Sequence, residues 1–568
     1  MTPIPVIRAA VAFVGIAILS ACNSGSDSST QVVETFRNPP EARSANGELR
    51  VQLNVATGPV QVGGQTMTTT VYNGMYIPPL LRLRPGDTLF LDLDNGSSEP
   101  TNLHLHGLNV SPLINTDGTV GDNIFVSIDP ANRLSYRIAI PGTHNPGLYW
   151  YHTHLHMLAQ RQVMGGLSGG LIIDGILDPL PQLQGLVERV MLLKDIQVTS
   201  QGTVPDDISP SSPSIRMVNG QVNPTISIRP GETQFFRIAN IGSDIYYRLR
   251  LDGHVFHEIA RDGNRATQIT TRQEILIPPS SRAEVLIQGA GPGSYALRAQ
   301  AFNTGPMGDT YDAATIATLI SQGSAVSPIA LPSTLPAVED FRTLPIARRR
   351  TITFTESSDG NTFFIDSGNG PKQFDPNIVD STIVQGTVEE WTLINATQEL
   401  HTFHIHQTDF QVTEINGVAQ PFLGHQDNVN LPYQGQETPA PGQVKVIIDF
   451  RNPIVIGRFV YHCHILEHED GGMMAVAEVV APTSSAPLSA AGRFMKVVNQ
   501  VLKPSAADRA ARSEETLKAV QAGSFCSSDP GARKVKVVRT KAVTELRTAT
   551  PPRPQGIAAA TELRATRE

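Results

Sequence analysis

The chain has 568 residues, a formal charge of −8 and only three cysteines, and hydrophobic residues make up 40% of it. This length allows three or four domains, and 47 glycines with 42 prolines favour a turn-rich β protein over a helix bundle or a coiled coil. The acidic balance argues against a nucleic-acid partner, and three cysteines are too few for a disulfide scaffold.

Residues 1–22 are predicted to be an export signal. An apolar run over residues 9–19 is too short to span a bilayer, and it ends in Leu19-Ser20-Ala21-Cys22. This ending resembles the bacterial lipobox, in which the cysteine is acylated; ordinary cleavage near Ala21 is the alternative. A serine-rich stretch follows, and residues 23–44 are predicted to form a tether. We therefore expect an exported protein at the periplasmic or cell-envelope face, with Cys22 as its lipid anchor.

A basic, low-order appendage is predicted at the other end of the chain, over residues 483–568. The composition changes sharply after Pro482, and segments such as Thr550-Pro551-Pro552-Arg553-Pro554 lack apolar side chains to bury. Solvated disorder suits this tail better than contact with an anionic membrane surface. We assign no function to the tail or to its cysteine, Cys526.

Between leader and tail, two sequence patterns recur about every 150 residues, which is the usual length of a domain. The first is a turn before a strand, at Gly86, Gly231 and Gly386. The second is a glycine that leads into an aromatic strand, at Gly147, Gly293 and Gly457. We therefore predict three tandem domains, at residues 45–180, 181–335 and 336–482. Short β-rich runs bounded by Gly, Pro, Asn and Asp predict an all-β fold in which each domain is an antiparallel sandwich.

Histidine pairs of the form His-x-His fall at matching places in the first and third copies. They are His104 and His106, His152 and His154, His404 and His406, and His462 and His464. The middle copy carries instead Arg248, Arg250, Arg298 and Gln300. Because side chains alternate along a strand, each pair points both imidazoles to one face. We predict that the first and third domains touch and share a metal cluster, while the second is a spacer without metal ligands.

A further group of potential ligands surrounds the last histidine pair. Cys463 lies between the two histidines with its side chain on the opposite face, His401 lies upstream, and His468 and Met473 follow. Two histidines, a thiolate and a thioether are the ligand set of a blue-copper electron-transfer site, although zinc would also accept His and Cys. A cysteine between two ligating histidines links two metal sites covalently, which is useful only if electrons travel. The pattern therefore favours copper.

These motifs resemble the four copper signatures of the three-domain multicopper oxidases, over about residues 45–482. The last motif most resembles those of bacterial spore-coat laccases and copper-efflux oxidases. The resemblance implies three tandem cupredoxin-like Greek-key β-sandwich domains and four copper ions. It assigns to the type 1 copper His401, Cys463, His468 and Met473. It assigns to the type 2 copper His104 and His404. It assigns to the two type 3 coppers His106, His152, His154, His406, His462 and His464. His156 extends the second motif beyond the family's ligand count, so we expect a supporting or structural role for it.

The resemblance also implies the reaction and roles for carboxylates. Electrons taken singly from a reductant would pass through Cys463 to the cluster, where four of them reduce O2 to water. Because this reduction consumes protons, carboxyl groups are expected near the cluster. Glu467 matches the acidic position that related bacterial enzymes use as a proton donor. Asp122 is the second candidate, and Asp117 competes with it.

The sequence leaves two classes of reductant open. Cuprous oxidases of this family usually carry a methionine-rich insert, and no such run occurs between residues 340 and 460. We therefore expect a laccase-like oxidase that acts on phenolic or similar aromatic reductants. A periplasmic cuprous oxidase for copper detoxification is the alternative, and a copper-binding or storage protein is the alternative from another class. Three domains that close one site need no partner subunit, so we expect a monomer that binds a small reductant and O2.

Overall fold

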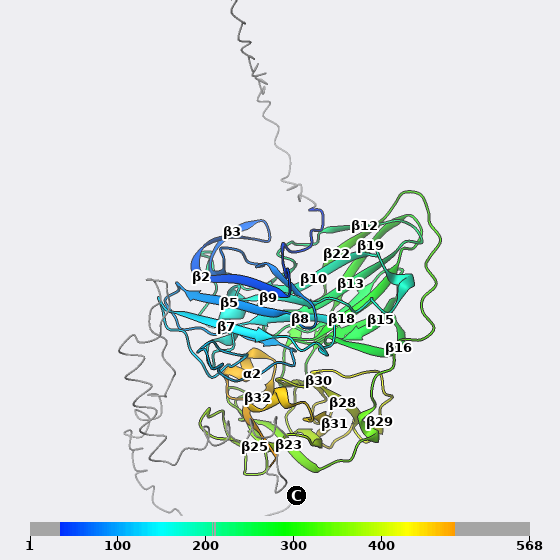
Figure 1. Ribbon diagram of the computed structural model, residues 1–568. Helices are drawn as coiled ribbons and strands as arrows, with labels where there is room; N and C mark the ends of the chain where they lie inside the picture. The colour runs from blue at the N-terminus through cyan, green and yellow to red at the C-terminus, as the bar shows by residue number, and fades with distance from the viewer. Residues whose placement is uncertain (1–33, 207, 210–211, 483–568) are drawn as a thin grey trace, which may run out of the picture. The chain divides into compact units, whose positions relative to one another are not determined.

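The computed structural model describes residues 34–206, 208–209 and 212–482. The predicted export signal, the predicted anchor Cys22 and the basic tail with Cys526 lie outside these residues. Strands dominate the described chain and form three successive sandwiches, which confirms the predicted all-β fold (Figure 1).

The first sandwich contains nine strands and one short helix. They are β1 (Glu41–Arg43), β2 (Glu48–Val62), β3 (Gln65–Tyr72), β4 (Leu80–Leu83), β5 (Thr88–Asn95), β6 (His104–His106), β7 (Arg133–Ala139), β8 (Gly147–His152), α1 (Ala159–Gly165) and β9 (Ser168–Ile173). The two sheets have the strand orders β1-β4-β9-β8-β6 and β3-β2-β5-β7.

The second sandwich is built from two larger sheets. Its strands are β10 (Val187–Ile196), β11 (Ile215–Val218), β12 (Thr225–Ile228), β13 (Thr233–Asn240), β14 (Tyr247–Leu251), β15 (Phe256–Arg261), β16 (Asn264–Arg272), β17 (Glu274–Ile277), β18 (Arg282–Gln288), β19 (Gly293–Gln300) and β22 (Ala314–Ser321). The strand orders are β11-β10-β13-β18-β15-β16 and β12-β22-β19-β14-β17. A separate small hairpin pairs β20 (Phe302–Asn303) with β21 (Thr310–Tyr311).

The third sandwich carries the last histidines. Its elements are β23 (Arg348–Glu356), β24 (Phe363–Asp366), β25 (Ser381–Val384), β26 (Val388–Asn395), β27 (His401–Ile405), β28 (Phe410–Ile415), β29 (Val418–Ala419), β30 (Asn428–Leu431), β31 (Gly442–Asp449), β32 (Gly457–Cys463), α2 (Leu466–Asp470) and β33 (Met474–Val480). The strand orders are β24-β23-β26-β31-β28-β29 and β25-β33-β32-β27-β30.

The three sandwiches repeat one core topology. The order β3-β2-β5-β7 recurs as β11-β10-β13-β18 and as β24-β23-β26-β31, while β4-β9-β8-β6 recurs as β12-β22-β19-β14 and as β25-β33-β32-β27. The predicted antiparallel sandwiches also contain parallel pairs: β2 with β5 and β4 with β9 are parallel, as are the matching pairs of the other sandwiches. The chain crosses to the opposite sheet between the two members of such a pair, which a hairpin cannot do.

Alternating side chains give β5 of the first sandwich one buried face. In β5, Leu89, Leu91 and Leu93 are at most 1% exposed, and the residues between them are half-buried. In contrast, β13 is buried at every position. The first sandwich packs against the sheet of the second sandwich that contains β13. The apolar contact between the two sandwiches includes Trp150 and Leu192. The second sandwich is therefore fixed firmly against the first.

The segment before β2 differs from the sequence prediction. Residues 34–44 were predicted to belong to the tether, yet β1 pairs with β4 in parallel, and the amide of Phe36 donates to the carbonyl of Thr225 at 2.9 Å. The side chain of Phe36 is 6% exposed. This apolar anchor makes residues 34–44 part of the folded body, which corrects the predicted boundary.

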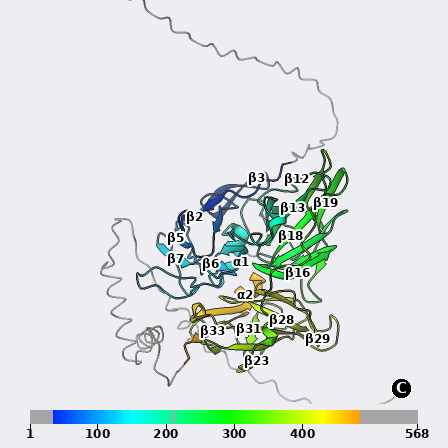
Figure 2. The same cartoon turned by 45° about the vertical axis from the view of Figure 1, so that its right-hand side comes forward.

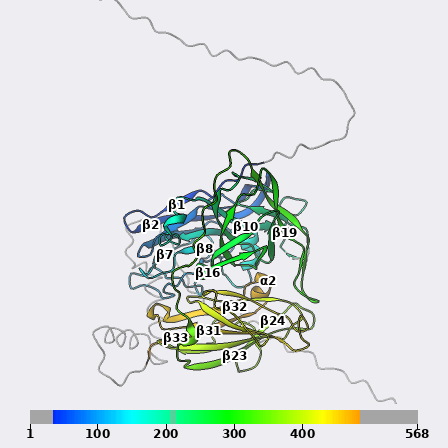
Figure 3. The ribbon, with the colours of Figure 1, turned by 90° about the vertical axis from the view of Figure 1, so that its right-hand side faces the viewer.

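The short helix α2 holds the loop that follows the last histidine pair. The amide of Leu466 donates to the carbonyl of Ser243 in the second sandwich at 3.2 Å. The amides of Ala159 and Gln160, at the start of α1, donate to the carboxylate of Asp470 at 3.3 and 2.8 Å. Figures 2 and 3 show α2 between the strands of the third sandwich and those of the other two. All three sandwiches thus fix this loop.

No helix among the described residues has both the length and the apolar content needed to cross a membrane.

Candidate metal centre

Two strand pairs carry the paired histidines. In the first sandwich His104 on β6 lies opposite His152 on β8, and in the third His404 on β27 lies opposite His462 on β32. The second histidine of each motif follows two positions later and shares the face of the first. All eight side chains are at most 1% exposed.

The two sets of imidazoles meet at the boundary between the first and third sandwiches. The rings of His104 and His406 stack with their centroids 3.8 Å apart, and those of His106 and His404 stack at 3.9 Å. Nε2 of His154 in the first sandwich also lies 3.2 Å from Nε2 of His462 in the third. The structure thus contains the contact between the first and third domains that the sequence predicted.

Hydrogen bonds occupy one nitrogen of several rings and leave the other facing inward. Nδ1 of His404 donates to the carbonyl of Asp427 at 2.8 Å, and Nδ1 of His152 donates to that of Thr153 at 2.7 Å. Within the described residues, buried ring nitrogens without a hydrogen-bond partner remain on His104, His106, His152, His404, His406 and His464. Because unpaired buried polar atoms are costly, a cluster of so many nitrogens fits a site that metal ions complete.

The protonation state of the rings also fits metal binding. Burial lowers the pKa of His152 to about 3. Burial, together with the neighbouring imidazoles, holds the pKa of His104 and His406 well below the usual range. Neutral imidazole is the form that binds a metal ion. Three sets of three histidines each bring one nitrogen per residue within 4.8 Å of one another: His104, His106 and His152; His104, His404 and His406; His154, His406 and His462.

A second group of ligand atoms lies within the third sandwich. Nδ1 of His401 lies 3.0 Å from Nδ1 of His468, and Sγ of Cys463 lies 3.7 and 3.6 Å from these two nitrogens. Burial raises the pKa of the Cys463 thiol, which therefore keeps its proton until a metal ion replaces it. A cysteine that binds a metal ion is a thiolate. Met473 is fully buried, and its carbonyl accepts the amide of Cys463 at 3.1 Å. The loop after β32 thus brings Met473 back beside Cys463.

The backbone joins the two groups directly. Cys463 faces His401 and His468, while its neighbours His462 and His464 face the histidine cluster. Alternation along β32 causes this division, because adjacent side chains of a strand point to opposite faces.

Comparison with known proteins agrees with this arrangement. Residues 54–176, 190–324 and 344–482 each match a family description of multicopper oxidase domains. The chain belongs to the multicopper oxidase family. Multicopper oxidases are copper-dependent oxidoreductases that use O2 as the electron acceptor.

Individual relatives cover most of the folded body. A multicopper oxidase of Staphylococcus aureus is 28% identical over 428 residues, which span 73% of this chain and 85% of that protein. A laccase of Bacillus subtilis is 28% identical over 60% of this chain and 72% of its own length. The cell division protein FtsP of Escherichia coli is 25% identical over 70% of this chain and 83% of its own length. A multicopper oxidase from Campylobacter jejuni, described as a metallo-oxidase, shares the fold with a TM-score of 0.67 and 24% identity, over 79% of this chain and 96% of that one.

One predicted carboxylate of this multicopper oxidase contacts the cluster. Asp122 is 2% exposed, and both of its oxygens lie 3.1 Å from Nδ1 of His104. It also accepts the amide of Leu105 at 3.0 Å and the side-chain amide of Gln407 at 2.9 Å. Burial raises the pKa of Asp122 to about 7. Its competitor Asp117 is exposed and accepts hydrogen bonds from Thr119 within a turn. The structure therefore places Asp122, and not Asp117, at the cluster.

The other predicted carboxylate is not the one that the structure places at the cluster. Glu469 is fully buried, with Oε1 3.2 Å from Nδ1 of His154 and Oε2 3.1 Å from Nδ1 of His462. Glu467 is only half-buried, and its amide donates to Asp244 at 3.2 Å. Two residues of a helix that are two positions apart point to different sides, and Glu467 lies near Glu399, whose pKa it raises. Glu469 replaces Glu467 as the carboxylate beside the cluster.

The sequence carries a signal that identifies Glu469. It directly follows the ligand-type residue His468, and it begins an acidic pair at the end of a five-residue helix. Sequence spacing alone does not say toward which centre such a side chain turns. That direction comes from α2, which the other two sandwiches hold in place.

The outer edge of His468 faces a carboxylate. Nε2 of His468 lies 3.3 Å from Oε1 of Glu399, and the ring of Phe363 stacks on the imidazole with centroids 4.2 Å apart. Burial, and then the neighbouring carboxyl group of Glu356, raise the pKa of Glu399 to about 10. The Nε2 edge of His468 thus lies beside a group of acidic side chains.

His156 does not join the cluster. Its ring is half-buried and meets the ring of Phe374 edge-on, with centroids 5.0 Å apart. This contact agrees with the structural role that the ligand count suggested.

Proposed function

We propose that this chain is a laccase-like multicopper oxidase that couples the one-electron oxidation of phenolic or similar organic reductants to the four-electron reduction of O2 to water. The observation that carries the proposal is the division along β32, where Cys463 faces one set of ligands and its two neighbours face another. A protein that only stores copper has no need for this direct link between two centres.

The proposed ligand sets follow the family assignment. His401, Cys463, His468 and Met473 would hold the type 1 copper. His104 and His404 would hold the type 2 copper. The two type 3 coppers would be held by His106, His152, His154, His406, His462 and His464. The inward-facing ring nitrogens and the convergence of Sγ with two Nδ1 atoms support these sets. Copper in these sites would supply one-electron redox chemistry and the binding of O2.

The protein's own residues provide the path for electrons and the supply of protons. Removing an electron from a reductant at the edge of His468 requires only contact, because the transfer is outer-sphere. The chain from Cys463 to His462 and His464 then spans the distance to the cluster through covalent bonds. Asp122 and Glu469 contact ligand histidines and are the groups that can hold protons beside the reacting oxygen.

A specific observation favours metal ions as a second class of reductant. Glu399 lies 3.3 Å from His468, and Glu356, Asp309 and Glu467 all raise its pKa, which shows that several acidic groups gather there. A metal cation can displace the proton that Glu399 holds and bind the carboxylate, so this edge suits a cationic metal reductant. A cuprous oxidase therefore remains the alternative to a laccase.

Oxygen uptake distinguishes these proposals. Copper-loaded protein without residues 1–22 is given either a simple phenol or cuprous ion as the sole reductant. Faster uptake with the phenol supports the laccase proposal, and faster uptake with cuprous ion supports the alternative. Absence of uptake with both would reject both oxidase proposals and revive copper storage. Glu399→Gln provides the matched variant, because it should slow the cuprous reaction more than the phenol reaction if the carboxylate binds a cation.

We further propose that the protein is exported as a monomer and anchored at the cell envelope through a lipid on Cys22. The support is the lipobox-like ending of the leader. Cys22→Ala should move the protein from the membrane fraction to the soluble periplasmic fraction, and an unchanged distribution would contradict the anchor.

A further inference from the structure

We propose that Arg282, in the second domain, is a positioning residue for the histidine cluster, so that the domain without metal ligands takes part in O2 reduction. This inference rests on the proposed function, because it concerns the same cluster. Arg282 is the first residue of β18 and is fully buried. A buried guanidinium keeps its charge, so its surroundings have to supply all of its partners.

One guanidinium joins all three domains. Nη1 and Nη2 donate to Oδ1 and Oδ2 of Asp427 in the third domain, at 2.7 and 2.6 Å. Nε donates to the carbonyl of Leu148 in the first domain at 3.1 Å. The backbone amide of Arg282 donates to Asp262 of its own domain at 2.8 Å. A bidentate pair of this kind fixes the direction of a carboxylate as well as its position.

Asp427 passes this constraint to two histidines from different domains. Its carbonyl accepts Nδ1 of His404 at 2.8 Å, and its Oδ1 lies 3.5 Å from Nε2 of His106. The two imidazoles stack on one another. The opposite nitrogens, Nε2 of His404 and Nδ1 of His106, are buried without a hydrogen-bond partner in the described chain. Asp427 therefore fixes which nitrogen of His404 is left for copper, as outer partners of metal-bound histidines do, and it places a carboxylate oxygen beside the outer nitrogen of His106.

The packing leaves the pair little freedom to move. Gly107 directly follows His106, and a side chain at this position would collide with Nη2 of Arg282 and with Oδ2 of Asp427. The glycine therefore lets the backbone of the first domain approach the pair closely. A shift of the guanidinium would be transmitted to His106 through this contact.

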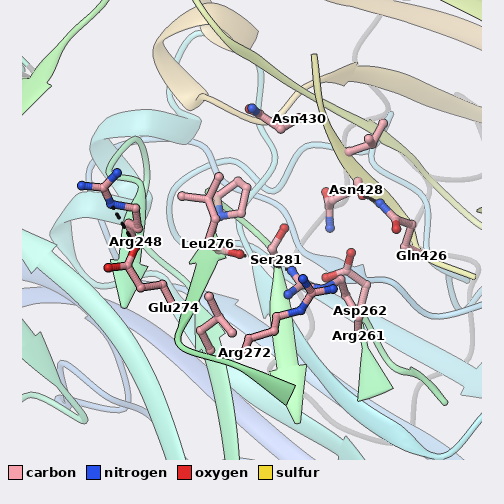
Figure 4. A pocket seen from close by; sticks show the side chains of 13 residues that line it. Arg248, Arg261, Asp262, Arg272, Glu274, Leu276, Ser281, Gln426, Asn428 and Asn430 are labelled. Atoms are coloured by element: carbon pink, nitrogen blue, oxygen red, sulfur yellow. Dashed lines mark hydrogen bonds and ion pairs between the residues drawn. The ribbon is translucent and has the colours of Figure 1, made fainter. Parts of the chain in front are cut away.

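A pocket lies close to the pair and is lined by the chain neighbours of both residues, Ser281 and Asn428. It has a volume of about 460 Å³ and lies between the second domain and β30, with Asp262, Ser281 and Asn428 among its lining residues (Figure 4). Nδ2 of Asn428 lies 3.4 Å from Nε2 of His106. Without the guanidinium, Asp427 would be a buried charge without its bidentate partner, and a carboxylate that shifted would change its contact with Nε2 of His106.

The test compares Arg282→Lys with a matched buried arginine. Lysine keeps the charge but loses the two-pronged contact with Asp427. The control is Arg237→Lys, since Arg237 is also buried in the second domain and contacts Glu188 at 2.9 Å and Glu284 at 3.3 Å, away from the histidines. Asp427→Asn is the second variant, because it keeps the size and the backbone carbonyl while removing the charge that Arg282 holds.

Four readouts separate positioning from simple stabilisation. They are copper content, blue absorption, the fraction of copper detected by electron paramagnetic resonance (EPR), and kcat and KM for O2. Arg282→Lys should keep the blue absorption, lower the rate of O2 reduction about 10- to 100-fold, and increase the EPR-detectable fraction as the coupled pair is disturbed. Arg237→Lys should change none of these. If Arg282→Lys does not fold, the same shifts are expected for Asp427→Asn.

Two results would overturn the inference. One is a wild-type EPR fraction and wild-type O2 kinetics in Asp427→Asn or folded Arg282→Lys, with only a lower melting temperature. The other is an equal loss in Arg237→Lys. Failure of the proposed function is distinguishable, because wild-type protein would then take up no O2, while the EPR comparison of the resting proteins would still test Arg282.

Discussion

The outer and middle domains place the same two strands side by side but carry different chemistry on them. In the third domain His404 lies opposite His462, and both are fully buried. In the middle domain Arg250 lies opposite Arg298, and their side chains are 53% and 47% exposed. The arginines lie within 3.5 Å of carboxylates, on Glu274 and on a nearby aspartate.

This difference follows from what covers the sheet. The histidine faces of the first and third domains cover each other, so their ring nitrogens lose water and gain partners only from one another or from metal ions. The matching face of the middle domain remains open, where guanidinium groups keep their water and pair with carboxylates at little cost. The strand pair alone does not create a metal site; two such faces that close on each other do.

The largest effect is expected from a change in the third domain, because in the proposed ligand sets the third domain, unlike the first, supplies a sulfur ligand. Cys463→Ser should abolish the blue absorption and reduce O2 uptake to the background rate, because the proposed electron path runs through this thiolate. Total copper should fall by about one ion per molecule, since the remaining histidines are unchanged. The measurements are absorption, copper content and oxygen uptake with a phenol. Blue absorption together with turnover in this variant would contradict the type 1 assignment.

The next effect tests which carboxylate serves the cluster that the outer domains share. Glu469→Gln should lower the rate of O2 reduction about 100-fold, because it removes a group that can hold a proton between His154 and His462. Glu467→Gln is the matched control, two positions away on α2, and should change the rate less than about threefold. Steady-state oxygen consumption at saturating reductant measures both. Equal rates for the two variants would contradict the assignment of the proton-holding role to Glu469.

Much of this arrangement could be predicted from local patterns. The His-x-His pairs were predictable because alternation in a strand puts both rings on one face, and matched positions in two copies required those copies to meet. Asp122 was also predictable, from its place shortly after the first motif. These are inferences over short distances along the chain, where backbone geometry decides the direction of a side chain.

The remaining features depend on contacts between distant segments. Glu469 was missed because the direction of α2 is set by Ser243 and by the start of α1, not by its own sequence. Arg282 was missed because its partner Asp427 lies in another domain, far along the chain. The parallel strand pairs were missed for the same reason, since each requires a crossover that no local pattern reveals.

Removal of copper tests whether the outer domains depend on metal while the middle domain does not. Each outer domain supplies half of the histidines, so copper should stabilise their contact. A ligand at about 100 times its Kd adds about 2.7 kcal/mol, and we expect the metal-free protein to melt several degrees lower. Amide hydrogen exchange should rise in β6 and β27 and stay unchanged in β15 and β16. Equal exchange in all four strands would show that copper does not bridge the outer domains.

The smallest effect concerns a buried charge that the middle domain keeps without any metal. Lys194 on β10 is fully buried, its Nζ has no hydrogen-bond partner among the described residues, and it lies 4.5 Å from the centre of the Tyr76 ring. Burial lowers the pKa of Lys194 from 10.5 to about 7. The unfolded chain therefore binds the proton more tightly, and the cost to folding is full below pH 7 and disappears as the pH rises toward 10.5.

Lys194→Met removes this cost while filling the same space. We expect the variant to be more stable than wild type by about 1 to 3 kcal/mol near pH 7, with the difference shrinking as the pH approaches 10. Melting temperatures across this range measure it, and Lys445→Met is the control, because Lys445 is 33% exposed and pairs with Glu414 at 2.9 Å. A gain that does not vary with pH would contradict the lowered pKa, because it would mean that Lys194 keeps its proton in the folded protein as it does in the unfolded chain. The outer domains then differ from the middle one in a simple way: their buried nitrogens are placed to bind metal ions, whereas Lys194 is accommodated by losing its proton as the pH rises above about 7.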